Sequence, residues 1–129
     1  MILGVGTDIC QISRIAKAIE NPRFAARVFT DLEWRRLDDL CGERVAERAA
    51  GMFAAKEAVA KALGTGFRGF GMQDVEILAD ERGRPVAMLH NGAAARAGGG
   101  RVHISISHDG GMALAFAVWE AKEAEGCAT

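Results

Sequence analysis

The sequence lacks an excess of charge of either sign. It has 16 lysines and arginines against 17 aspartates and glutamates, a formal net charge of −1 over 129 residues. Proteins whose main task is to hold nucleic acid or anionic membranes usually carry a clear basic excess. The near balance argues against both of these classes, and the length indicates one domain.

Long apolar runs and clustered cysteines are missing as well. The apolar run that ends at Trp119 is far shorter than the roughly 20 residues of a membrane-spanning helix. Asp8 interrupts the first apolar residues and no basic residue precedes them, so we expect no signal peptide. The cysteines, Cys10, Cys41 and Cys127, form no CxxC pair and leave one thiol over under any pairing. We therefore expect reduced thiols and a cytoplasmic location.

The first half of the chain contains mainly patterns that predict helices. The apolar residues Met1–Thr7 predict a buried strand. Three later stretches predict helices. Ile12–Glu20 has apolar residues at helical spacing and is ended by Asn21-Pro22. A capping box begins the second at Thr30, which runs to about Leu40, and the third, Glu43–Leu63, is rich in alanine and ends at a glycine.

The second half shows strand signals. Alternating residues predict one hairpin over residues 75–89 and a second over 101–119, with a turn at Asp109-Gly110. Between them, Asn91 caps a predicted short helix over Asn91–Ala97. We therefore expect an α+β fold, a single domain with a mainly antiparallel sheet packed on a long central helix. Residues 1–120 form this domain, and residues 121–129 are expected to fray.

Two groups of polar residues can be interpreted in two ways each. Glu57 and Lys61 are four residues apart on one helix face, the spacing of an ordinary surface ion pair. Asp8 follows an apolar strand, where it would either cap the next helix or join Glu57 in holding Mg²⁺. Spacing alone favours the cap.

A row of polar residues, His103, Ser105 and Ser107, shares one face of the last predicted hairpin. It is either a solvated face or a set of donors for phosphate oxygens, and the sequence does not separate the two. Ser107-His108-Asp109 is no catalytic triad, because neighbours on a strand point to opposite faces. The segment 64–69 fits G-x-G-x-x-G but closes a helix, whereas the dinucleotide motif opens one.

Taken together and in this order, these segments resemble one family, the holo-acyl-carrier-protein synthases, which are the short 4′-phosphopantetheinyl transferases. The resemblance extends to about Glu120. It is carried by GVGTDI from Gly4, RFAARVFT from Arg23, FAAKEA from Phe53 with Lys61 and Gly64-Thr65-Gly66, QDVEI from Gln73, and the row from His103 to His108.

The resemblance implies a transfer of phosphopantetheine from coenzyme A to a serine of an acyl carrier protein, with Mg²⁺ held by Asp8 and Glu57. Lys61 would accept the serine proton or stabilise developing charge, and a metal-bound water is a third candidate for the base. Coenzyme contacts are implied for Lys56, Gly64, Thr65, Gly66, His103, Ser105 and Ser107. The family commonly has arginine where this chain has Met52, and Arg48, one turn earlier, is our candidate substitute.

The resemblance also implies partners. Arg14, Arg23 and Phe24 would dock the acidic carrier protein, and the short members of the family are trimers with active sites between subunits. The carrier could serve fatty acid or polyketide synthesis. Two other classes remain as alternatives: a non-catalytic module that binds carrier proteins or nucleotides, and a metal-dependent phosphodiesterase that uses water.

Overall fold

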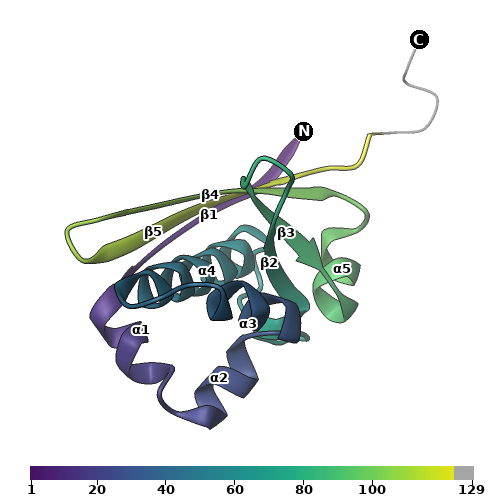
Figure 1. The fold of residues 1–129 in the computed structure, drawn as a ribbon. Coiled ribbons are helices and arrows are strands. Elements are labelled where there is room, and N and C mark those ends of the chain that lie inside the picture. Colours follow the sequence, from purple (N-terminus) through teal and green to yellow (C-terminus); the bar gives the residue numbers. More distant parts are fainter. Residues whose placement is uncertain (124–129) are drawn as a thin grey trace.

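A three-stranded antiparallel sheet lies across one long helix (Figure 1). The computed structural model describes residues 1–123. Its elements are β1 (Ile2–Gln11), α1 (Ile12–Ala18), α2 (Pro22–Val28), α3 (Asp31–Asp38), α4 (Glu43–Ala62), a 3-10 turn (Met72–Asp74), β2 (Val75–Ala79), β3 (Pro85–Leu89), α5 (Asn91–Ala97), β4 (Arg101–Asp109) and β5 (Met112–Glu120). The expected α+β class is confirmed, with strand order β1-β5-β4 and a separate β2–β3 hairpin.

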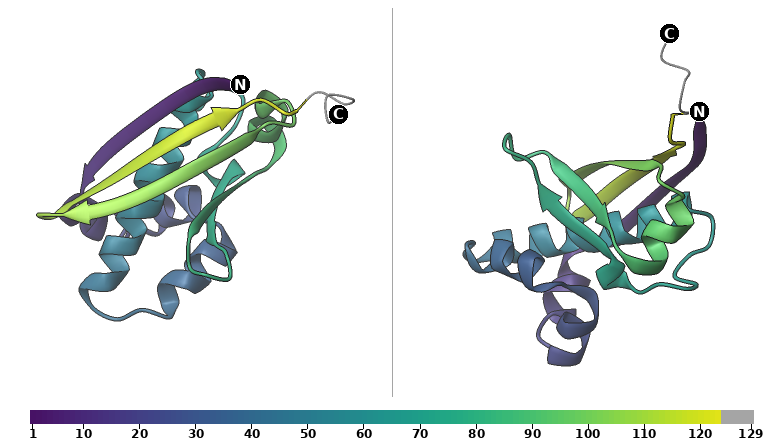
Figure 2. Two further views of the ribbon diagram at one scale, coloured as in Figure 1. Left: turned by 90° about the horizontal axis from the view of Figure 1, so that it is seen from above. Right: turned by 90° about the vertical axis from the view of Figure 1, so that its right-hand side faces the viewer.

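Helix α4 packs closely beneath β1 because β1 carries glycine where it crosses the helix. A Cβ added at Gly4 would lie 1.9 Å from the carbonyl oxygen of Ala62, and one at Gly6 would lie 2.0 Å from that of Ala58. Only glycine permits such an approach of backbone to backbone. The view from above shows α4 running under all three strands (Figure 2). The glycines therefore bring the residues of β1 next to those of α4.

The two faces of the sheet differ in composition. The face toward α4 carries Ala113, Ala115 and Ala117 of β5, all fully buried against an equally alanine-rich helix. The opposite face carries larger apolar residues that remain exposed: Val5 by 60%, Ile9 by 59% and Phe116 by 50%. At these positions β5 thus meets α4 with small residues, whereas large apolar residues on the opposite face remain in solvent, which indicates a further contact.

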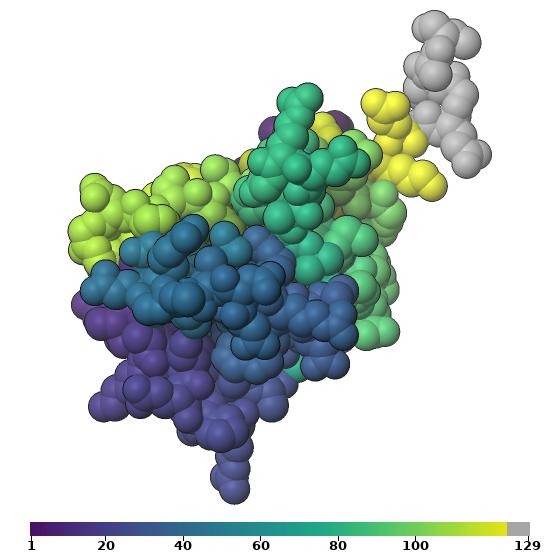
Figure 3. Space-filling model, in the orientation of Figure 1, coloured from purple at the N-terminus to yellow at the C-terminus, as the bar shows by residue number. Residues whose placement is uncertain are grey.

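Helices α1 and α2 lie at the lower end of the molecule, below α3 and the start of α4 (Figure 3).

The predicted capping box is confirmed: the Thr30 side chain accepts from Glu33 N, and the Glu33 side chain accepts from Thr30 N. Helix α2 was not predicted. Asn21 and Pro22, interpreted as a break, also begin this helix, since Asn21 accepts from Arg23 N and Pro22 holds the first position.

Other boundaries differ from expectation for local reasons. Strand β1 continues past Asp8 to Gln11, because it pairs with β5 as far as Met112. The last turn lies at Gly110-Gly111, both at positive φ, rather than at Asp109-Gly110. Asn91 does not cap α5: His90 is the N-cap residue, and Asn91 is the first helical residue, with its side chain donating to Asp74.

The described residues contain no helix long and apolar enough to span a bilayer. Residues 121–123 follow β5 without regular secondary structure, and Ala121 N donates to the carbonyl of Met1. The predicted fraying of 124–129 concerns residues outside the described part. Cys10 and Cys41 are free thiols in the structure, whereas Cys127 also lies outside it.

Candidate functional site

Asp8, Glu57 and Lys61 meet where β1 crosses α4. The Lys61 Nζ lies 3.2 Å from Asp8 Oδ1 and donates to the carbonyl oxygen of Thr7 at 3.0 Å. The Asp8 side chain is 18% exposed and that of Lys61 55%, so the group opens to solvent at an edge of the sheet. Asp8 does not cap α1, whose N-cap residue is Gln11. The interpretation of Asp8 as a helix cap is therefore wrong.

The two carboxylates of this group repel each other. Partial burial, and next the negative charge of Asp8, raise the pKa of the Glu57 carboxyl, whereas Lys61 lowers it. A divalent cation between the two carboxylates would relieve this repulsion, and hard oxygen ligands of this kind suit Mg²⁺. No group of three or more His, Cys, Asp or Glu residues that could hold a metal occurs in the described part of the chain. Water or substrate oxygens would have to complete the coordination.

Lys56 lies elsewhere and needs a correction. Its side chain is fully buried, and Nζ lies 2.8 Å from Glu33 Oε1, 2.8 Å from the carbonyl oxygen of Met72 and 2.7 Å from that of Val75. An ammonium group has three donors, and these three acceptors use all of them. Lys56 therefore joins α4 to α3 and β2, and its predicted contact with coenzyme A is wrong because the ammonium does not reach solvent.

The glycine-rich loop begins one turn after Lys61. Gly64 and Gly66 adopt positive φ, and Gly66 N donates to the carbonyl of Ala60, which turns the loop back over the end of α4. Thr65 is partly exposed, and its hydroxyl donates to the carbonyl of Gly66. The structure thus brings the predicted loop residues to the same end of α4 as Lys61.

The row on β4 is not part of the same cluster. His103, Ser105 and Ser107 are exposed and pair in register with Val118, Phe116 and Leu114 of β5, on the face away from α4. Asp8 points to the other face, and β1 and β4 are opposite edges of the sheet. Two strand spacings, about 10 Å, separate these edges. Within one chain, the β4 row and the Asp8 group therefore lie on different faces of the sheet.

A basic cavity of about 380 Å³ lies near the start of α4. Its lining includes Arg36, Arg44, Arg48 and Met52. Arg36 and Arg48 line the same cavity, and burial, and next the positive charge of Arg48, lower the pKa of Arg36. Met52 itself is buried in the core. Neither Arg36 nor Arg44 was singled out from the sequence; the four-residue spacing of Arg44 and Arg48 on one helix could have indicated Arg44, whereas Arg36 lies on another helix.

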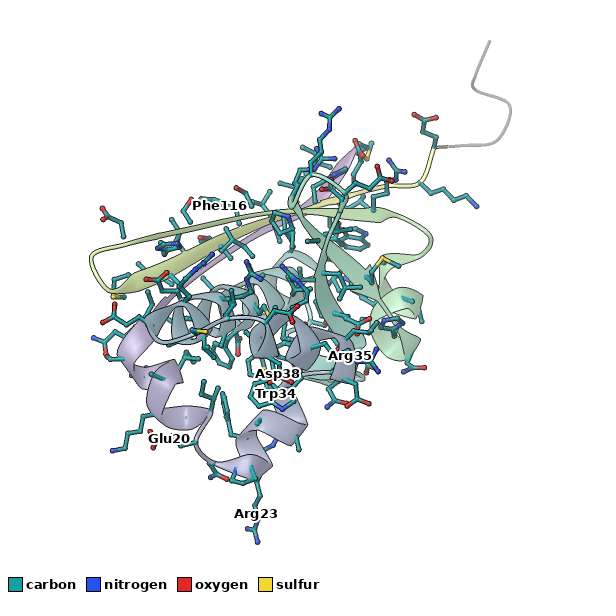
Figure 4. The ribbon with its side chains drawn as sticks, viewed as in Figure 1. Glu20, Arg23, Trp34, Arg35, Asp38 and Phe116 are labelled. Carbon is teal, nitrogen blue, oxygen red and sulfur yellow. The ribbon has the colours of Figure 1, made fainter. Side chains whose placement is uncertain are left out.

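The predicted docking residues gather on α1 and α2. Arg14 and Arg23 are exposed, and Figure 4 shows Arg23 pointing away from the body of the molecule at its lower end. Phe24 is half-buried and packs on Phe53 of α4, with ring centroids 6.0 Å apart. Phe53 is one turn before Glu57 on the same helix, so Phe24 joins the basic surface to the carboxylate group.

The chain is similar to known proteins over most of its length. The family model of the 4′-phosphopantetheinyl transferase superfamily matches residues 4–117. Because this match covers most of the chain, the protein belongs to that superfamily.

Individual relatives narrow the class. The chain is 46% identical to a holo-[acyl-carrier-protein] synthase of Clostridium perfringens, over 93% of this chain and 95% of that protein. It is also 46% identical to the synthase of Clostridium novyi, over 98% and 94%. The crystal structure of the Bacillus anthracis synthase in complex with coenzyme A (3′,5′-ADP) superposes with a TM-score of 0.83 at 37% identity, covering 95% of this chain and 99% of that one.

Proposed function

We propose that the protein transfers the 4′-phosphopantetheine group of coenzyme A to a serine of an apo acyl carrier protein and releases adenosine 3′,5′-bisphosphate. The observation that carries the proposal is the meeting of Asp8, Glu57 and Lys61 at an open edge of the sheet. The relatives named as holo-[acyl-carrier-protein] synthases, one of them bound to coenzyme A, support the choice of substrates. Such a reaction belongs in the cytoplasm.

The chemistry needs alignment and charge stabilisation more than covalent help. The serine oxygen forms a bond to the β-phosphorus, the bond from that phosphorus to the bridging oxygen breaks, and the serine proton passes to solvent. Asp8 and Glu57 would hold Mg²⁺, which when bound neutralises charge on the pyrophosphate. Lys61 is held as a donor by Asp8 and the Thr7 carbonyl, and it stabilises the negative charge that develops on the phosphate.

The site is completed by association, and we propose a homotrimer. The β4 row lies on the outer face of the sheet, beside the exposed Val5, Ile9 and Phe116. In the trimer a neighbouring subunit covers this apolar face. The coenzyme then lies between the Asp8 group of one subunit and the β4 row of the other. Large exposed apolar surfaces of this kind are typical of subunit interfaces. His103, Ser105 and Ser107 would then bind phosphate oxygens of a coenzyme held mainly by the other subunit.

The basic cavity at the start of α4 supplies a second phosphate contact. Met52 offers no charge where the family commonly has arginine, while Arg48 lines the cavity together with Arg44 and Arg36. We assign a coenzyme phosphate to Arg48. The measurement is the dissociation constant of coenzyme A for Arg48→Ala beside wild type, and an unchanged constant would remove Arg48 from the site.

The carrier protein docks on the surface formed by Arg14, Arg23 and Phe24. Exposed arginines on α1 and α2, together with a half-buried aromatic ring on α2, suit an acidic helix with apolar residues. The contact of Phe24 with Phe53, which lies one turn before Glu57, supports this docking position for the carrier.

The test is mass spectrometry of an apo acyl carrier protein incubated with this protein, coenzyme A and Mg²⁺, beside an EDTA control and Glu57→Ala. We expect a mass gain of one phosphopantetheine that both controls lose. Release of bisphosphate without any carrier would indicate a phosphodiesterase. Binding of carrier or coenzyme with neither product would indicate a non-catalytic module.

A further inference from the structure

Helix α5 has no place in the site described so far, yet it contacts both ends of the glycine-rich loop over residues 64–70. Its residues Gly92 and Arg96 are four apart and therefore share one helix face. Arg96 reaches the start of the loop and Gly92 lies against its end. The two contacts differ in kind, and each of them constrains the loop.

At the start of the loop, Arg96 Nε donates to the carbonyl oxygen of Leu63 at 2.8 Å. Leu63 is the C-cap residue of α4, and the last carbonyls of a helix have no partner within it. A cation at this end is also favoured by the helix dipole. A Cβ added at Gly64 would lie 3.6 Å from Arg96 Nη2. Arg96 thus supports the point at which α4 becomes the loop.

Arg96 is itself held in place by an aromatic ring. Its guanidinium lies over Trp119, 5.1 Å from the ring centroid, a cation–π contact. The Trp119 indole donates to the carbonyl of Ala97 at 3.2 Å, so the ring is fixed to the same helix. Since Trp119 belongs to β5, the support is anchored in the sheet.

At the other end of the loop, the absence of a side chain matters. A Cβ added at Gly92 would lie 2.1 Å from the carbonyl oxygen of Gly69 and 3.2 Å from Phe70 Cβ. Gly92 does not adopt positive φ, so its backbone would accept alanine. The glycine is required by the close approach of the loop, and alanine there would push the loop away from α5.

We propose that α5 is a brace for the loop over residues 64–70 and that Arg96 and Gly92 are positioning residues for coenzyme binding. The inference rests on the proposed function and on the coenzyme contacts that the family resemblance implies for Gly64, Thr65 and Gly66. In this role neither residue contacts the coenzyme itself. Each acts by fixing the backbone of the loop beside Lys61.

The test measures the dissociation constant of coenzyme A by calorimetry, without carrier, for Arg96→Met and Gly92→Ala of the full chain. Arg35→Met, which removes an exposed arginine of α3, is the matched control. We expect about a fivefold or greater rise of the constant in both variants and none in the control. Arg96→Lys keeps the charge but not the planar group over Trp119, so it should recover part of the affinity.

Steady-state kinetics separate this role from a purely structural one. The brace predicts a higher KM for coenzyme A with the KM for the carrier unchanged, whereas simple loss of folded protein lowers the yield of active enzyme and changes neither KM. Unchanged coenzyme affinity in folded Arg96→Met, Arg96→Lys and Gly92→Ala would overturn the inference. A wild-type protein that binds coenzyme A but transfers nothing would overturn the proposed function alone.

Discussion

Two lysines of α4, five residues apart, each pair with a carboxylate and differ in almost everything else. Lys56 and Glu33 are both fully buried, and their charged atoms are 2.8 Å apart. Lys61 and Asp8 are 3.2 Å apart at the open edge of the sheet, with Lys61 more than half exposed. The helix turns the first lysine toward α3 and β2, and the second toward β1.

The two lysines differ in whether a substrate can reach them. A buried ammonium with three protein acceptors has no donor left for a substrate, so Lys56 can only hold elements together. Lys61 uses two acceptors and remains open to solvent, so a phosphate can approach it. Two lysines five residues apart on one helix therefore differ in role: Lys56 stabilises the fold, and Lys61 is the one that is open to the proposed chemistry.

The largest effect is expected from Lys61→Met. Loss of a positioned cation or proton-transfer group lowers kcat by about 100- to 10,000-fold. Thermal unfolding should change little, because exposed ion pairs contribute about 0–1 kcal/mol. The measurement is single-turnover transfer, with Lys122→Met, at an exposed lysine near the end of the described chain, as control. Substantial activity of Lys61→Arg would support charge stabilisation, and an inactive arginine variant would favour a base.

The opposite pattern is expected from Lys56→Met. Removing it leaves the Glu33 carboxylate buried without its partner, which costs about 3–5 kcal/mol of unfolding free energy. The measurement is urea unfolding. Glu33→Gln combined with Lys56→Met should recover part of this loss, since glutamine leaves no buried charge and its side-chain oxygen still accepts from a backbone N–H. A loss below about 1 kcal/mol in the single variant would contradict the structural role.

Glu57→Gln should stabilise the metal-free protein while lowering the rate of transfer. Burial and Asp8 raise the pKa of Glu57, so the folded state binds this proton more tightly than the unfolded state. That contribution is present at low pH and is lost as the pH rises through the raised pKa. In EDTA, Glu57→Gln should therefore unfold at a higher temperature than wild type at pH 7, with a smaller difference near pH 4.5. Mg²⁺ should stabilise wild type and not the variant.

The smallest effect concerns the docking surface, far from both lysines. Arg23→Ala should raise the KM for the carrier by about fivefold at low salt and by less at about 0.5 M salt, because screening weakens exposed charge contacts. Arg82→Ala, in the turn between β2 and β3, serves as control. An equal effect of both variants, or an effect on the KM for coenzyme A instead, would argue against this surface.

Local patterns were sufficient for most elements. The capping box at Thr30, the alanine-rich run that became α4 and both hairpins are confirmed. The errors fall where contacts distant in sequence decide. Strand β1 extends past Asp8 because β5 pairs with it, and Asn91 gives its side chain to Asp74 instead of capping α5.

The candidate site divides in the same way. Spacing placed Glu57 and Lys61 on one helix face, and the structure brings Asp8 to them across 53 residues from Lys61. Spacing could not predict that Lys56 is buried, because its burial depends on contacts with α3 and β2, which the pattern of one helix does not contain. The basic cavity likewise combines α3, α4 and the β2–β3 turn.

The sequence by itself determined the class of fold, the helix that carries Glu57 and Lys61, and the alternation that puts His103, Ser105 and Ser107 in one row, because these follow from spacing along one element. Only the tertiary structure decided which lysine is buried, that Asp8 is no helix cap, and that the β4 row faces away from Asp8. Those outcomes depend on which elements pack together, and here the close approach of β1 to α4 at Gly4 and Gly6 sets that packing.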